Sequence, residues 1–120
     1  MLWPAGIRFA GVAVIGVALI HGFAAEAKLF PHVTAASPAH LLLLRFVWQA
    51  STLAWITFGV LLIASPRLGP DPTRWIAGAA MVNLALGALG GLIATGPTHY
   101  GWMLLATLVA LIGTVTPWRA

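Results

Sequence analysis

Hydrophobic residues occupy this chain in four long stretches, separated by short segments rich in proline, glycine and polar residues. The stretches cover approximately residues 7–25, 39–64, 73–95 and 100–116. A helix needs about 20 mostly apolar residues to cross the hydrocarbon core of a bilayer. We therefore expect four membrane-spanning helices, of which the second is the longest and the fourth is short.

The segments between these stretches carry residues that begin and end helices. Ser37 before Pro38 is typical of an N-cap followed by the first helical residue, and Asp71 before Pro72 repeats that pattern. The segment TGPTHYG, residues 95–101, is typical of a tight turn. Short connections join antiparallel neighbours. The sequence therefore predicts an all-α integral membrane protein, with a single membrane domain over residues 1–120 folded as an antiparallel four-helix transmembrane bundle.

The composition excludes most other classes of protein. Of the 120 residues, 61% are hydrophobic and 7% are charged, and the mean hydropathy is +0.99. A soluble domain of this length could not cover its surface with so few charges. The net charge of +4 comes from Lys and Arg scattered between the apolar stretches, which indicates membrane topology rather than a nucleic-acid partner. The absence of cysteine excludes disulfides and thiolate metal sites.

The basic residues are divided unequally between the two ends of the expected bundle. One end holds Arg8, Arg67, Arg74 and Arg119, and the other holds Lys28 and Arg45. Because cytoplasmic segments carry the excess of Lys and Arg, we expect both termini in the cytoplasm. The N-terminal segment also resembles a secretory signal with a cleavage site near Ala25-Glu26-Ala27. Its basic region is weak, so we expect it to be retained as the first span.

Polar residues within the second stretch share one side of the expected helix. At about 100° per residue, Gln49 lies about 40° from Arg45, and Thr52 lies about 20° to the other side. Such groups need partners inside a membrane. We expect Arg45 to pair with Glu26, with Gln49 and Asn83 forming hydrogen bonds between helices. The alternative is that this polar seam contacts a ligand: an anionic lipid headgroup, a carboxylate or a quinone carbonyl.

Small residues predict the helix-packing faces. In the third stretch, one face collects seven small or polar residues and includes a GxxxG motif; its members are Ala79, Ala80, Asn83, Gly87, Gly90, Gly91 and Ala94. The first stretch carries a similar stripe that includes Gly11 and Gly22. Small residues let helix backbones approach closely in a membrane. We expect both faces to pack against other helices.

All four histidines fall at the expected outer end of the bundle, and Glu26 joins them; they are His21, His32, His40 and His99. Imidazoles with a carboxylate suit zinc, copper or nickel, and two axial imidazoles suit haem. Their spacing matches no metal-binding motif, so ligands would have to converge from loops and helix ends. We expect ordinary interfacial hydrogen bonding, with metal, haem or another ligand at this cluster as the alternative.

Two segments resemble a known group of proteins. LIHGFAAEAKLFP followed by LLRFVWQASTLAW is similar to small four-span bacterial inner-membrane proteins of no established activity, with matches at His21, Glu26, Arg45, Trp48 and Trp55. Ala25 and Gln49 depart from that pattern, which has glycine and histidine there. The resemblance covers about half of the chain. It implies a multi-pass protein of the bacterial inner membrane and transfers no activity.

Catalysis has little support, because the chain has only two acidic residues and no nucleophile–base or phosphate-binding motif. We expect a non-catalytic accessory or assembly subunit of a larger bacterial membrane complex, respiratory or photosynthetic, whose partners are lipids and other integral membrane subunits. The alternatives are a small protein that binds a metal ion, haem or small ligand at the outer face, and a self-associating small transporter.

Overall fold

A computed structural model describes residues 2–34 and 37–119, and all the regular structure in those residues is helical. The long helices are α1 (Trp3–Ala24), α2 (Pro38–Ala64), α3 (Pro70–Thr95) and α4 (Tyr100–Val115). A π-helical turn, Ala25–Leu29, and a 3₁₀ turn, Phe30–His32, follow α1, and another 3₁₀ turn, Ser65–Arg67, follows α2. The expected all-α fold with four helices is confirmed.

The helices begin where proline and capping residues permit, and two starts differ from the expected ones. α1 begins at Trp3 rather than residue 7, because Pro4 suits the first turn of a helix. Ser37 is the N-cap of α2, as predicted: its hydroxyl accepts from the His40 N–H at 3.2 Å. The predicted cap at Asp71 is wrong. α3 begins at Pro70 after Gly69, whose φ of +100° favours glycine.

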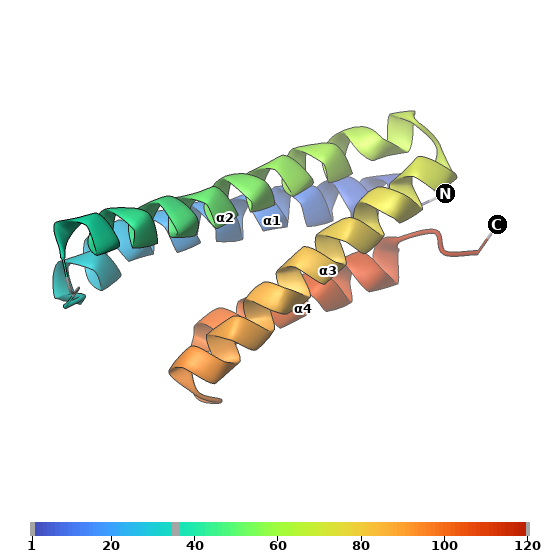
Figure 1. Ribbon diagram of the computed structural model, residues 1–120. Coiled ribbons are helices and arrows are strands. Elements are labelled where there is room, and N and C mark those ends of the chain that lie inside the picture. Colours follow the sequence, from blue (N-terminus) through green and yellow to red (C-terminus); the bar gives the residue numbers. More distant parts are fainter. Residues whose placement is uncertain (1, 35–36, 120) are drawn as a thin grey trace.

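The four helices form two hairpins that meet at one end and diverge at the other (Figure 1). α1 lies along α2, and α3 lies along α4, while both termini lie with the α2–α3 connection at the shared end. The buried core is concentrated near that end, and its largest fully buried side chains include Ile7, Leu62, Leu84 and Ile112. Of the described α2 residues, all those before Thr52 are exposed or half-buried. The hairpins therefore pack together over only part of their length.

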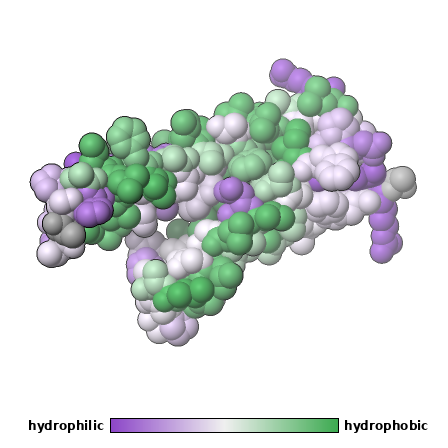
Figure 2. Space-filling model, viewed as in Figure 1, coloured by the Kyte–Doolittle hydropathy of each residue, from purple (hydrophilic) through white to green (hydrophobic). Residues whose placement is uncertain are grey.

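Three of these helices have the length and apolar character needed to cross a membrane: α1 with its following turns, α2 with its following turn, and α3. α4 is equally apolar but has 16 residues, a length of about 24 Å against a hydrocarbon core of about 30 Å. On the face shown in Figure 2, hydrophobic residues occupy much of the length of both hairpins, and most hydrophilic residues lie near the ends. This distribution suits a chain surrounded by lipid.

The α1–α2 hairpin is held by a close glycine crossing. A Cβ added at Gly11 would lie 2.5 Å from the carbonyl oxygen of Gly59, and one at Gly59 would lie 2.7 Å from that of Gly11. Further along, a Cβ at Gly22 would lie 2.9 Å from the Thr52 methyl group. The predicted contribution of Gly11 and Gly22 to packing is therefore present, and it operates within one hairpin.

The small-residue face predicted on α3 is only partly used inside the fold. Gly87 packs against Trp55 and Leu105, and Gly91 packs near Trp102. Gly90, however, has no described atom within 4 Å of where its Cβ would stand. The face that α3 buries is instead centred on Ala77, Ala80, Leu84 and Ala88, because α4 offers large side chains there, Leu105, Leu108 and Ile112.

Candidate functional site

A group of polar contacts between α1 and α2 lies where α1 changes from α-helical to π-helical geometry. At this change, the Ala25 N–H is shared between the carbonyl oxygens of His21 and Gly22. Two consecutive residues of α2 donate to the same two carbonyls: the Trp48 indole reaches His21 at 3.2 Å, and the Gln49 amide reaches Gly22 at 3.3 Å. A carbonyl oxygen can accept two hydrogen bonds. α2 is thereby fixed against α1 at its polar end.

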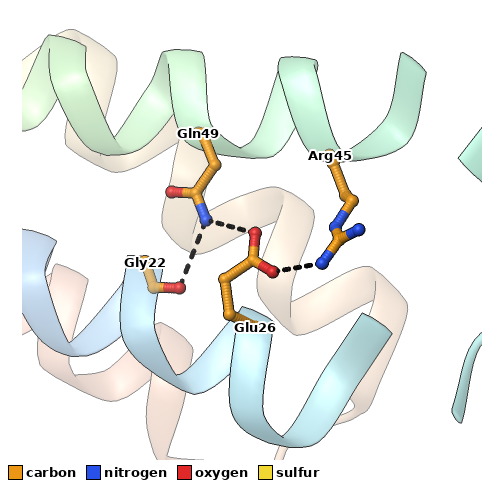
Figure 3. Close-up of polar contacts among 4 residues, drawn as sticks. All are labelled: Gly22, Glu26, Arg45 and Gln49. Carbon is orange, nitrogen blue, oxygen red and sulfur yellow. Dashed lines mark hydrogen bonds and ion pairs between the residues drawn. The ribbon is translucent and has the colours of Figure 1, made fainter. Parts of the chain in front are cut away.

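Glu26 in the π-helical turn receives two donors from α2 (Figure 3). Its Oε2 accepts from Nη2 of Arg45 at 2.6 Å, and its Oε1 accepts from Nε2 of Gln49 at 3.1 Å. The Arg45 guanidinium also lies over the Phe30 ring, 5.5 Å from its centroid. The side chains of Arg45 and Glu26 remain 46% and 41% exposed. This is the pairing expected from the sequence, but it lies at an open surface.

An apolar groove runs from Glu26 along the α1–α2 interface. Its volume is about 230 Å³, and its lining comprises Leu19, Gly22, Phe23, Glu26, Gln49 and Thr52. Glu26 and Gln49 form its polar end, and Leu19 and Phe23 supply exposed apolar side chains. An amphiphile with a polar head and a hydrocarbon tail matches this arrangement.

A second cluster also lies between α1 and α2. The His21 ring stacks on Trp48, with centroids 4.4 Å apart and planes 5° from parallel, and it also contacts the Trp55 ring at 4.3 Å. His21 Nε2 lies 3.3 Å from the Ser51 hydroxyl. The imidazole is thus enclosed by two indoles and one hydroxyl. The sequence analysis did not identify Ser51, although its position three residues after Trp48 places it near the same side of the helix.

Trp55 continues this cluster to the other hairpin. It is buried, and its indole N–H donates to Oδ1 of Asn83 on α3 at 2.9 Å. Gly87, one turn beyond Asn83, leaves the room that the indole ring fills. Asn83 was expected to share the seam of Arg45 and Gln49. The structure places it with Trp55 instead, whose ring also contacts His21 of α1.

The four histidines make separate hydrogen bonds with different partners. His32 Nδ1 lies 3.0 Å from the Lys28 carbonyl oxygen, His40 Nδ1 lies 2.8 Å from the Ser37 hydroxyl, and the His99 ring accepts from the Gly101 N–H. His99 is the N-cap of α4 in the second hairpin, which diverges from the first (Figure 1). Among the described residues, no three His, Cys, Asp or Glu side chains are placed to hold a metal ion. The metal or haem alternative therefore has no assembled ligand set in this part of the chain.

The chemistry available at the Glu26 site is binding and electrostatic. It offers one cation, one carboxylate and one amide beside an apolar groove. Comparisons with known proteins add no function to this geometry, since no family model, no curated protein and no solved structure matches the chain.

Proposed function

We propose that this chain is a non-catalytic accessory or assembly subunit of a larger bacterial membrane complex, respiratory or photosynthetic, and that it packs against other integral membrane subunits. The proposal rests on a surface that its own fold leaves open. The observation that supports it most directly is the Asn83 amide, which lies in a groove between α2 and α3.

This α2–α3 groove has a volume of about 540 Å³, and its lining is apolar apart from that amide: Phe58, Trp75, Gly78, Ala79, Val82, Asn83 and Leu86. Oδ1 of Asn83 accepts from Trp55, while its Nδ2 has no hydrogen bond to any described residue. A free amide donor in hydrocarbon is costly, and polar side chains commonly bond across helices there. A helix of a partner subunit would supply the missing acceptor.

Small residues in the same groove suit such a partner. A Cβ added at Gly78 would meet no described atom within 4 Å, and Ala79 is exposed beside it. In membranes, small residues at a helix surface permit close backbone approach, and van der Waals contact then supplies much of the association energy. Lipid alone would not require this combination of small side chains around a hydrogen-bond donor.

The test is purification of the tagged chain from its native membrane in mild detergent, followed by native mass measurement. We expect a partner membrane protein at fixed stoichiometry. Gly78→Leu should remove that partner, because the new side chain fills the groove. The matched control is Gly16→Leu on α1, where the site is equally open, and it should retain the partner. A wild-type chain that purifies as a stable monomer would refute the proposal.

A further inference from the structure

We propose that the α1–α2 groove binds a membrane phospholipid whose headgroup carries a primary ammonium. The headgroup phosphate would contact Arg45, the ammonium would contact Glu26, and part of one acyl chain would lie against Leu19 and Phe23. This inference goes beyond the proposed function, because it concerns the opposite side of α2 and requires no partner subunit.

Arg45 has donors to spare for a phosphate. A guanidinium carries five N–H groups, and among the described residues its hydrogen bonding is a single contact from Nη2 to Glu26. The side chain is 46% exposed, and its stacking on Phe30 restricts its position. Charge-assisted hydrogen bonds from guanidinium to phosphate are among the stronger polar contacts. The guanidinium N–H groups of Arg45 that are not bonded to Glu26 are therefore suitable donors to a phosphate.

Glu26 has acceptor capacity left for an ammonium. A carboxylate offers about four lone-pair sites, and Arg45 and Gln49 occupy two of them. With 41% of the side chain exposed, a primary ammonium could donate to the remaining sites. The Arg45 guanidinium would then contact the headgroup phosphate, and the Glu26 carboxylate would contact the headgroup ammonium. A quaternary ammonium has no N–H to donate, and a glycerol headgroup has no cation.

The site also lies at a suitable depth. α2 has 27 residues, a length of about 40 Å, which exceeds the hydrocarbon thickness of about 30 Å by about 10 Å. Arg45 is seven residues after Pro38, about 10 Å from the start of the helix. Glu26 lies in the turn after α1, and the groove continues from it to Leu19 along the span. The headgroup would thus lie at the polar end of the groove near Glu26, and the acyl chain would lie along its apolar part near Leu19.

The experiment is native mass spectrometry of the delipidated protein with three lipids of identical acyl chains added in equal amounts: phosphatidylethanolamine, phosphatidylcholine and phosphatidylglycerol. We expect the ethanolamine lipid to be retained about fivefold over the choline lipid, a difference of ~1 kcal/mol. Glu26→Gln should bring that ratio close to one. Arg45→Gln should reduce retention of all three lipids.

The matched control is Asp71→Asn, which removes the carboxylate of the Asp71–Arg74 ion pair at the other end of the molecule and should leave the ratio unchanged. Because the readout is a ratio within one sample, general destabilisation does not imitate the effect. If Glu26→Gln fails to fold, Leu19→Trp should fill the groove and lower all retention. Equal retention of ethanolamine and choline lipids, preferred retention of the glycerol lipid, or a ratio unaffected by Glu26→Gln would overturn the inference.

Discussion

Trp55 connects the two hairpins at the scale of single residues. Its ring fills the space beside Gly87, and its indole N–H bonds to Asn83. Trp48, seven residues earlier, lies on nearly the same side of α2 and stacks on His21 within the first hairpin. One side of α2 therefore uses two tryptophans for two purposes. Trp48 joins α2 to α1 by stacking on His21, whereas Trp55 joins the first hairpin to the second by its hydrogen bond to Asn83.

This arrangement predicts coupling between Trp55 and Asn83. Asn83→Leu leaves the buried indole N–H without an acceptor and should destabilise the fold by about 1 kcal/mol. Trp55→Phe removes the donor, so the double variant should lose less stability than the sum of the two single variants. The measurement is the free energy of unfolding in mixed micelles for all four chains. Trp75→Phe, at a residue 82% exposed, is the control, and strictly additive losses would contradict the prediction.

At the scale of elements, the α1–α2 hairpin depends on two backbones in contact. Gly11 and Gly59 face each other so closely that a Cβ on either would meet the other's carbonyl oxygen. Backbone cannot rotate away as a flexible side chain can, so the helices would have to separate. The polar contacts around Glu26 lie beyond this crossing and depend on the same helix-to-helix distance.

Gly11→Ala and Gly59→Ala should therefore each lower the free energy of unfolding by about 1–3 kcal/mol, the usual cost of overpacking. Gly16→Ala on the same helix faces open space and should change stability by less than about 0.5 kcal/mol. Thermal unfolding of the three variants in one detergent measures this difference. Equal stability losses at Gly11 and Gly16 would show that the close crossing is not formed.

At the scale of the whole molecule, the two hairpins behave as two arms joined at one end (Figure 1). The first arm contains the Glu26 site, and the junction of the arms contains the Trp55–Asn83 contact. The C-terminal segment is hydrogen-bonded to the start of α3, since Arg74 donates to the Pro117 carbonyl oxygen. These contacts hold the joined end, while the far halves of the arms have few residues buried against each other.

Distances between spin labels should detect this shape. The chain has no cysteine, so labels can be attached at introduced pairs without background. Ala5→Cys with Thr114→Cys lies at the joined end and should give a short, narrow distance distribution in electron paramagnetic resonance. Thr34→Cys with Thr98→Cys lies at the two free ends and should give a clearly longer one. Similar short distances for both pairs would indicate a closed bundle instead.

The orientation in the membrane also belongs to this scale. If the end with the excess of arginine is cytoplasmic, a membrane-impermeant thiol reagent should label Thr34→Cys and Thr98→Cys from the non-cytoplasmic side of the membrane. Asp71→Cys and Arg119→Cys should react only after the membrane is permeabilised. The reverse pattern of labelling would show that the termini face outward.

The sequence by itself determined where the helices form and that the fold is all-α. Four apolar stretches bounded by proline and glycine leave little freedom in where helices form, and Ser37-Pro38 marked one start to the residue. The pairing of Glu26 with Arg45 could also be predicted, because two opposite charges flank one short connection between apolar spans. The start of α3 was misjudged, because Gly69 can adopt a φ that lets the helix begin before Asp71.

Only the tertiary structure decided which faces meet. Helical spacing placed Gln49 on a polar stripe and Asn83 on a face of small residues, but the rotation of each helix about its axis depends on the fit of facing side chains. That fit put Asn83 against Trp55 and left Gly90 uncovered. The hairpins diverge (Figure 1), and His99 belongs to the second hairpin as the N-cap of α4. A one-dimensional pattern specifies position along a helix, whereas the distance between helices is set by packing.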